Sequence, residues 1–174
     1  MTYWKNDSTI GGSWIWVKED GLVQRIAGTD DHGNYVCQGL DAADYTIQTE
    51  KDATADGNAV KANDALAALK IAFGINPNGA GGGDVSTYQY LAADVDKNGK
   101  VQAADALNIL KMAYNMGSAP QKEWIIVPES VGSETMSSTN VVWLTGEIDV
   151  MIDQDQQLDL VGVLKGDVNG SWAG

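Results

Sequence analysis

A run of acidic and amide side chains between residues 94 and 105 has the spacing of a calcium-binding loop. Oxygen-bearing side chains occupy positions one, three, five and twelve of a twelve-residue segment, as in an EF-hand loop: Asp94, Asp96, Asn98 and Asp105. Gly99 occupies position six, where such a loop turns sharply. Lys100 occupies position seven, which contributes only a backbone carbonyl group, so its side-chain type is unrestricted. The segment therefore predicts a calcium site.

A second, less regular copy of this pattern lies upstream. It begins at Asp52 and closes at Asp64, which makes it thirteen residues long and one residue longer than the first loop. Its expected ligands are Asp52, Thr54, Asp56, Asn58 and Asp64, with the carbonyl group of residue 58 or 59 in the middle of the loop. Asn63 is the alternative closing ligand if the loop keeps twelve residues. Val60 and Val101 have equivalent places in the two copies, where paired loops share a short strand.

Each predicted loop brings three carboxylates into a small volume. These groups repel one another and lose hydration unless a cation lies between them. Calcium suits such a site because it accepts about six to eight oxygen ligands in flexible geometry, whereas magnesium requires a tight octahedron. The chain has one histidine and one cysteine, so a zinc or copper site is not expected. We therefore expect two calcium ions and no other cofactor.

The segments that follow the two loops repeat each other. Residues 64–74 have the sequence Asp-Ala-Leu-Ala-Ala-Leu-Lys-Ile-Ala-Phe-Gly, and residues 105–115 have Asp-Ala-Leu-Asn-Ile-Leu-Lys-Met-Ala-Tyr-Asn. Their apolar spacing predicts two helices, which we expect to end near Gly74 and Gly117. Each helix has a stripe of leucine and aromatic side chains on one face: Leu66, Leu69 and Phe73 in the first, and Leu107, Leu110 and Tyr114 in the second. We expect these stripes to form the contact between the helices.

Each of these two loops is closed by aspartate rather than glutamate, and each is followed by a predicted helix. In this arrangement the chain resembles a type I dockerin over about residues 51–116. The resemblance implies calcium binding and an interaction role. Dockerins bind cohesin modules, largely through side chains just before the closing aspartate. The resemblance therefore implies, as an alternative function, a cohesin-binding module of a polysaccharide-degrading complex.

The chain departs from the dockerin pattern in three ways. The two loops begin 42 residues apart, which is longer than the compact repeat of the family, and a glycine-rich insert at residues 76–84 fills the distance. The residues before the closing aspartates also offer few hydrogen bonds: Ala103 and Ala104 in one loop, and Ala62 and Asn63 in the other. Calcium binding therefore follows from the resemblance more directly than cohesin binding does.

The sequences on both sides of the loops have the short alternating runs that are typical of β-strands. We expect strands at residues 13–17, 22–26, 35–38 and 45–48, and again at 123–127, 140–144, 147–152 and 158–164, with a loop at 129–139. The prediction is an α+β fold in which residues 1–50 and 118–174 build one β-sandwich and residues 51–117 form an inserted dockerin-like pair of EF-hand loops and helices. The alternative is two separate β units, one on each side.

Two further resemblances bear on the origin of the chain. Residues 29–48 resemble the later half of a CnaB-type or carboxypeptidase-regulatory-like β-sandwich, a class of domain that serves as stalk or spacer in exported proteins. The ending Gly-Asp-Val-Asn-Gly-Ser-Trp, together with the repeated helix sequence, resembles the C-terminal part of large exported bacterial proteins. These resemblances imply an extracellular or cell-surface location. We expect a terminal turn at this ending, and a third calcium site at Asp167 and Asn169 is the alternative.

The 174-residue chain is strongly acidic, with a net charge of −13. Nucleic acids and anionic membranes are not expected as partners, because their phosphates attract lysine and arginine. His32 lies in a polar turn without a nucleophile motif, and Asp153 and Asp155 lie in a polar loop, so none of them predicts catalysis. We expect a non-enzymatic protein, whose partners are a cohesin-like protein or neighbouring domains of its parent chain.

Overall fold

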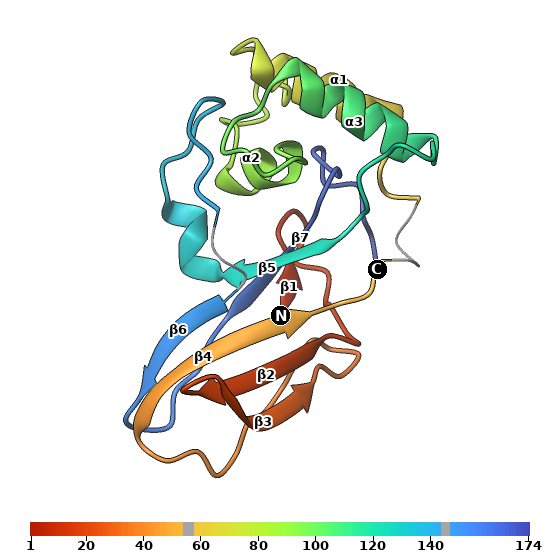
Figure 1. Cartoon of the computed structure of the whole chain (residues 1–174). Helices are drawn as coiled ribbons and strands as arrows, with labels where there is room; N and C mark the ends of the chain where they lie inside the picture. Colours follow the sequence, from red (N-terminus) through yellow and green to blue (C-terminus); the bar gives the residue numbers. More distant parts are fainter. Residues whose placement is uncertain (54–57, 144–146) are drawn as a thin grey trace.

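The computed structural model describes residues 1–53, 58–143 and 147–174. Within these residues it contains seven strands, three α-helices and one 3-10 helix, which confirms the predicted α+β class. Figure 1 shows the helices together at one end of the molecule and the strands at the other. None of the helices in the described part of the chain has the length and apolar character needed to cross a membrane.

Each of the two sheets contains strands from before and after the helices. The first sheet has the order β1–β7–β5, in which β1 is parallel to β7 and β5 is antiparallel to it. Its strands are β1 (Thr2–Tyr3), β5 (Trp124–Pro128) and β7 (Leu160–Leu164). The second sheet is antiparallel and has the order β3–β2–β4–β6. Its strands are β2 (Trp14–Glu19), β3 (Leu22–Gly28), β4 (Ala43–Glu50) and β6 (Glu147–Ile152).

Six of the eight predicted strands are present, as β2 to β7. The strand predicted at residues 35–38 is wrong; there, the Tyr35 hydroxyl donates to the Leu158 carbonyl at 2.7 Å. Residues 140–143 are the described part of another predicted strand, and they do not form a strand either. Val141 instead donates its N–H to the carbonyl of Gly99 at 2.8 Å. This segment therefore lies along the loop of residues 94–105. A 3-10 helix, Glu129–Ser133, interrupts the predicted loop at 129–139.

The two predicted helices are α1 (Ala62–Ala72) and α3 (Ala103–Ala113), and each has its closing aspartate in its first turn. The helix α1 is followed by Gly74 with φ 71°, as predicted, because glycine has no Cβ penalty in this left-handed conformation. The end predicted at Gly117 is wrong. Asn115, with φ 49°, takes the equivalent position after α3.

The contact between α1 and α3 uses a different face from the predicted one. Four of the six stripe residues are more than half exposed to solvent: Leu66 by 54%, Phe73 by 70%, Leu107 by 55% and Tyr114 by 68%. Leu110 is 36% exposed, and Leu69 alone is partly buried and packs against the core. The buried faces carry mostly smaller residues, namely Ala65, Ala67, Ala68 and Ile71 on α1 and Ala106, Ile109 and Met112 on α3. Small side chains let the helix backbones approach closely, so the outer stripes face away from the core.

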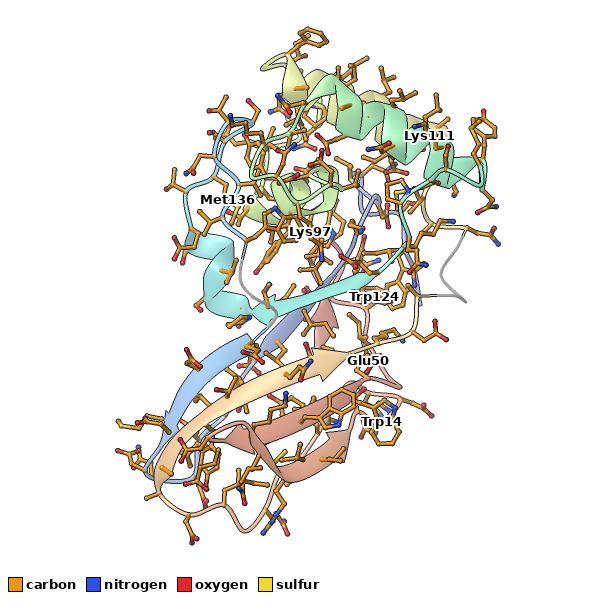
Figure 2. All side chains as sticks on the ribbon, in the orientation of Figure 1. Trp14, Glu50, Lys97, Lys111, Trp124 and Met136 are labelled. Carbon is orange, nitrogen blue, oxygen red and sulfur yellow. The ribbon has the colours of Figure 1, made fainter. Side chains whose placement is uncertain are left out.

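A third helix, α2 (Thr87–Ala93), was not predicted and leads directly into Asp94. The side chains of Ser86 and Gln89 exchange hydrogen bonds with each other's backbone N–H groups, which caps its start. All three helices share one hydrophobic core with the first sheet, whereas the second sheet has a core of its own. Figure 2 shows Trp124 on β5 beneath the helices and Trp14 on the second sheet. The described parts of both predicted loops contribute to the core shared with the first sheet, through Ala59 and Val60 in one and Val95 and Val101 in the other.

Candidate metal centre

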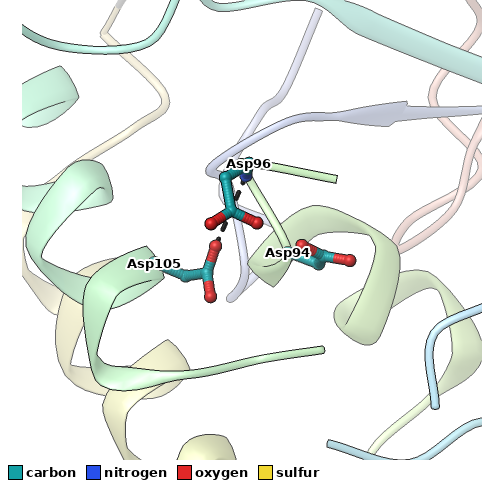
Figure 3. A group of neighbouring side chains, drawn as sticks. All are labelled: Asp94, Asp96 and Asp105. Atoms are coloured by element: carbon teal, nitrogen blue, oxygen red, sulfur yellow. Dashed lines mark hydrogen bonds between the residues drawn. The ribbon is translucent and has the colours of Figure 1, made fainter. Parts of the chain in front are cut away.

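The loop between α2 and α3 brings Asp94, Asp96 and Asp105 together (Figure 3). One carboxylate oxygen from each residue lies within 4.8 Å of the others, which makes this group a candidate metal site among the described residues. Asp94 and Asp105 are fully buried, whereas Asp96 is exposed. Carboxylates at this separation repel one another strongly unless a cation neutralises them.

Backbone N–H groups fix the first of these carboxylates. Asn98 and Gly99 donate to the two oxygens of Asp94 at 3.2 and 2.8 Å. Gly99 adopts φ 84°, which is the reason for a glycine at this position. The indole N–H of Trp143 donates to Asp94 Oδ2 at 2.6 Å. A carboxylate oxygen has more than one lone pair, so these hydrogen bonds orient Asp94 and still leave it able to bind a metal ion.

Asp105 closes the loop from the first turn of α3. Its Oδ1 accepts hydrogen bonds from the N–H groups of Val95 at 3.1 Å and Asp96 at 3.4 Å, the second of which is drawn in Figure 3. Its Oδ2 accepts from the N–H of Gln102 at 2.8 Å. The side chain therefore joins the start of the loop to the helix N-terminus, where the helix dipole favours negative charge.

The pKa values of the buried aspartates are raised. Burial is the main cause for both Asp94 and Asp105, because it disfavours the ionised form. The charges of Asp96 and Asp94 raise the pKa of Asp105 further. A divalent cation would act in the opposite direction and favour the ionised carboxylates.

The remaining predicted ligands of this loop are Asn98 and Lys100. The side-chain amide of Asn98 donates to Asp96 Oδ2 at 2.9 Å, so it lies beside the acidic group. The Lys100 side chain is exposed, as expected for a position that contributes only its carbonyl. The next residue, Val101, donates its N–H to the carbonyl of Ser138 at 2.8 Å. The sequence pattern predicts Val60 as the strand partner of Val101, but the 138–141 segment pairs with this part of the loop instead.

The side chain of Lys97, in the same loop, is directed to Glu123 rather than to the acidic group. Lys97 forms an ion pair with Glu123, and Lys165 forms another at 3.2 Å. The Lys97 ammonium group also lies 5.3 Å from the centre of the Trp143 ring (Lys97 is labelled in Figure 2). The positive charge of Lys97 therefore lies over the ring of Trp143, the residue that donates a hydrogen bond to Asp94.

The predicted upstream loop has a different environment. Thr54 and Asp56 lie outside the described residues, and Asp52 and Asn58 are exposed. Asp64 is fully buried, and its Oδ1 accepts a hydrogen bond from the N–H of Asn169 at 2.9 Å. The ligand set of Asp52, Thr54, Asp56, Asn58 and Asp64 therefore stays a prediction. The Asp64 carboxylate joins the start of α1, through the N–H of Lys61, to the C-terminal segment.

Asp64 lies close to a second buried carboxylate, Asp167. The pKa of Asp64 is raised from 3.8 to about 6, mainly by burial and also by the charge of Asp167. Asp167 is fully buried and accepts hydrogen bonds from the Tyr3 hydroxyl at 2.8 Å and from the N–H groups of Ser171 and Trp172 at 2.9 Å each. The sequence did not predict this pairing, although the half-loop at residues 166–172 was a signal for it.

No family model matches this chain, and neither a curated protein nor a solved structure matches it. The resemblance to dockerins therefore stays an expectation based on the motif residues, and the function has to be inferred from the geometry of the site.

Proposed function

We propose that the loop of residues 94–105 binds Ca²⁺ and that the chain is a non-enzymatic calcium-binding structural and interaction module. The observation that carries this proposal is the group of three carboxylates within 4.8 Å of one another, in the register of an EF-hand loop. Carboxylate, amide and carbonyl oxygens are hard ligands. They fit calcium better than the softer metals that histidine and cysteine bind.

Calcium at this loop would order the elements around it. Asp94 follows the last residue of α2 and Asp105 belongs to the first turn of α3, so one ion would hold the two helices at a fixed separation. Trp143 would be held too, through its hydrogen bond to Asp94. Because the ion neutralises two buried carboxylates, its binding is coupled to folding. At a calcium concentration about a thousandfold above Kd, the stabilisation is about 4 kcal/mol.

We further propose that this dockerin-like unit is inserted into β-sandwich-like support in an exported bacterial protein. Two observations support the insertion. Both sheets contain strands from either side of the helices, and the helical core continues into β1, β5 and β7. The proposed location is outside the cell or on its surface, where calcium reaches the millimolar levels at which weak sites fill.

Exposed apolar side chains on α1 and α3 favour the alternative function, a cohesin-binding assembly module of a polysaccharide-degrading complex. Leu66 and Phe73 of α1 are exposed, as are the equivalent Leu107 and Tyr114 of the α3 repeat. Exposed apolar patches commonly mark interaction sites. Figure 2 places Lys111 on this outer helix pair. The neighbouring domains of the parent chain are the other candidate partner.

Calcium binding is tested by thermal unfolding, followed by circular dichroism in excess chelator and in millimolar calcium. We expect calcium to raise the unfolding midpoint of the wild type. Isothermal titration should show that Asp105→Asn loses one bound ion, whereas Asp155→Asn, which changes an exposed aspartate, loses none. Equal midpoints in chelator and calcium, with no heat of binding, would refute the proposal.

The partner alternative has its own test. A pull-down with immobilised cohesin modules, with and without calcium, should retain the chain only in calcium. The Leu107→Asp variant should abolish retention, and Leu22→Asp, at an exposed leucine of β3, should not. Failure of every cohesin to retain the chain would leave the calcium proposal in place and reject this alternative.

A further inference from the structure

The C-terminal segment of residues 167–172 has the conformation of the first half of the 94–105 loop. Asp167 accepts hydrogen bonds from the N–H groups four and five residues later, at 2.9 Å each. Asp94 accepts from the groups four and five residues later as well, at 3.2 and 2.8 Å. The residue at the fourth position has positive φ in both segments, 70° at Gly170 and 60° at Lys97. The two segments are therefore alike in geometry as well as in sequence.

Asp64 stands in the same relation to this segment as Asp105 does to its own loop. Each closing aspartate accepts a hydrogen bond from the N–H at position three, which is Asn169 for Asp64 and Asp96 for Asp105, at 2.9 and 3.4 Å. Each also accepts one from the N–H of its helix N-cap residue, at 2.8 Å in both cases. The closing half of one loop thus meets an opening half from the far end of the chain.

The middle of the loop is matched as well. Ala59 lies five residues before Asp64, as Lys100 lies five residues before Asp105, so Ala59 occupies position seven. The Ser171 hydroxyl, at position five, donates to the carbonyl oxygen of Ala59 at 2.9 Å. The carbonyl that a calcium loop supplies at position seven is therefore within reach of the C-terminal segment.

Two features of the surroundings indicate a cation as the ligand. Asp64 and Asp167 are both fully buried, and the ion pairs found among the described residues, which join Lys97 and Lys165 to Glu123, involve neither of them. The side-chain amide nitrogen of Asn169 is buried without a hydrogen-bond partner in the described structure. Rotating the Asn169 amide group by a half-turn exchanges its nitrogen and oxygen, so that the oxygen takes the buried position. A cation bound to that oxygen and to both carboxylates would remove the cost of burying them.

We propose that Asp167, Asn169 and Ser171, together with the carbonyl of Ala59 and the carboxylate of Asp64, form a second calcium site divided between two distant parts of the chain. The inference rests on the calcium function proposed for the 94–105 loop, which provides the template. It keeps Asp64 as the closing ligand and replaces the opening ligands predicted at residues 52–56 with the C-terminal segment.

The N-terminal strand supports this site from behind. The Tyr3 hydroxyl of β1 donates to Asp167 Oδ2 at 2.8 Å, in the way that the Trp143 indole donates to Asp94 Oδ2 at 2.6 Å. Tyr3 is therefore a positioning residue for the first ligand. An ion in the divided site would tie together β1, the start of α1 and the end of the chain.

Calcium stoichiometry, measured by isothermal titration on the full chain, tests the divided site. The wild type should bind two ions, and Asp167→Asn and Asp105→Asn should each bind one. The double variant should bind none. Asp52→Asn distinguishes the divided site from the contiguous loop, because the divided site predicts that this variant still binds two ions. Asp155→Asn, at an exposed position, is the control for the loss of one charge.

The outcomes separate this inference from the proposed function. No binding by the wild type would overturn both. If the wild type bound one ion and Asp105→Asn bound none, the divided site would be overturned and the calcium function of the 94–105 loop would stand. Loss of an ion in Asp52→Asn but not in Asp167→Asn would move the site to residues 52–64 and overturn the divided site as well.

A gain-of-affinity variant keeps the test decisive if Asp167→Asn does not fold. Asn169→Asp adds a carboxylate at position three, which is the residue type that the 94–105 loop has there. Calcium affinity rises with the number of charged ligands, so one of the two sites should bind about tenfold more tightly. The affinities of both sites remaining at their wild-type values would overturn the divided site.

Discussion

The buried carboxylate of Asp64 predicts how stability changes with pH once calcium is removed. Its pKa is about 6 in the folded protein, against an ordinary value of 3.8. A group with a raised folded-state pKa stabilises the fold fully below its ordinary pKa, and that stabilisation is lost as the pH rises through the folded-state value. For Asp64 the loss amounts to about 3 kcal/mol between acidic and neutral pH. The calcium-free protein should therefore become less stable from about pH 4 to pH 7.

Burial and the neighbouring groups together set the raised pKa of Asp64. Burial is the largest cause and Asp167 acts in the same direction, whereas the N–H groups of Asn169 and Lys61 oppose them. Burial also raises the pKa values of Asp94 and Asp105, so these groups add to the loss. Glu123 acts in the opposite sense, because Lys97 and Lys165 outweigh its burial and lower its pKa. Its stabilising contribution is lost only in acid, as the pH falls through its lowered pKa.

Chemical denaturation at several pH values, in chelator and in saturating calcium, measures this effect. With calcium the dependence should reverse, because protons compete with the ion for the carboxylates and stability then rises with pH. In chelator, Asp64→Asn should remove about 3 kcal/mol of the pH dependence, and the control Asp155→Asn should remove almost none. If the chelated wild type instead gained stability from about pH 4 to pH 7, the reasoning about the buried carboxylates would be wrong.

Three further predictions concern the loop and the helices. Trp143→Phe removes the indole donor to Asp94 and should weaken calcium binding at this loop by about 1 kcal/mol, or several-fold in Kd, in a calcium titration. Gly99→Ala places a Cβ on a residue with φ 84° and should lower the unfolding free energy by about 1 kcal/mol even in chelator, as measured by urea denaturation. Ile109→Ala should cost about 2–5 kcal/mol in the same assay, whereas Leu107→Ala, at a 55% exposed side chain, should change stability by less than about 0.5 kcal/mol.

The acidic group of the 94–105 loop could be predicted from the sequence because all the side chains expected as ligands lie within twelve residues. The geometry that brings them together is local: Gly99 makes the turn and α3 begins just before Asp105. The partner of Asp64 could not be found in the same way, because Asn169 is 105 residues away from it. The thirteen-residue length of the 52–64 segment and the unfinished loop at residues 166–172 were each visible, but nothing local connects them.

The helices show a similar division between local and tertiary information. The repeated helices and the left-handed glycine that follows α1, Gly74, could be predicted from local patterns. The buried face did not, because hydrophobicity alone places Leu66 and Leu107 inside, whereas the close approach of the helices requires alanine there. The two-residue strand β1 was missed for the same reason. It exists only because β7 lies beside it, and its own sequence carries too few residues for a pattern.

The two proposed sites differ in what their occupation requires. The proposed ligands of the 94–105 loop are neighbours in sequence, so calcium binding there would not require distant parts of the chain to be folded first. The divided site needs Asp64 and Asp167 to meet, and closing a chain segment of this length has an entropic cost that only the folded β structure offsets. Tyr3 makes this dependence stronger, because it holds Asp167 from the opposite end of the chain. Calcium at the divided site would therefore bind the completed fold rather than the helical unit alone, and its stabilisation would be shared by both sheets and the helices.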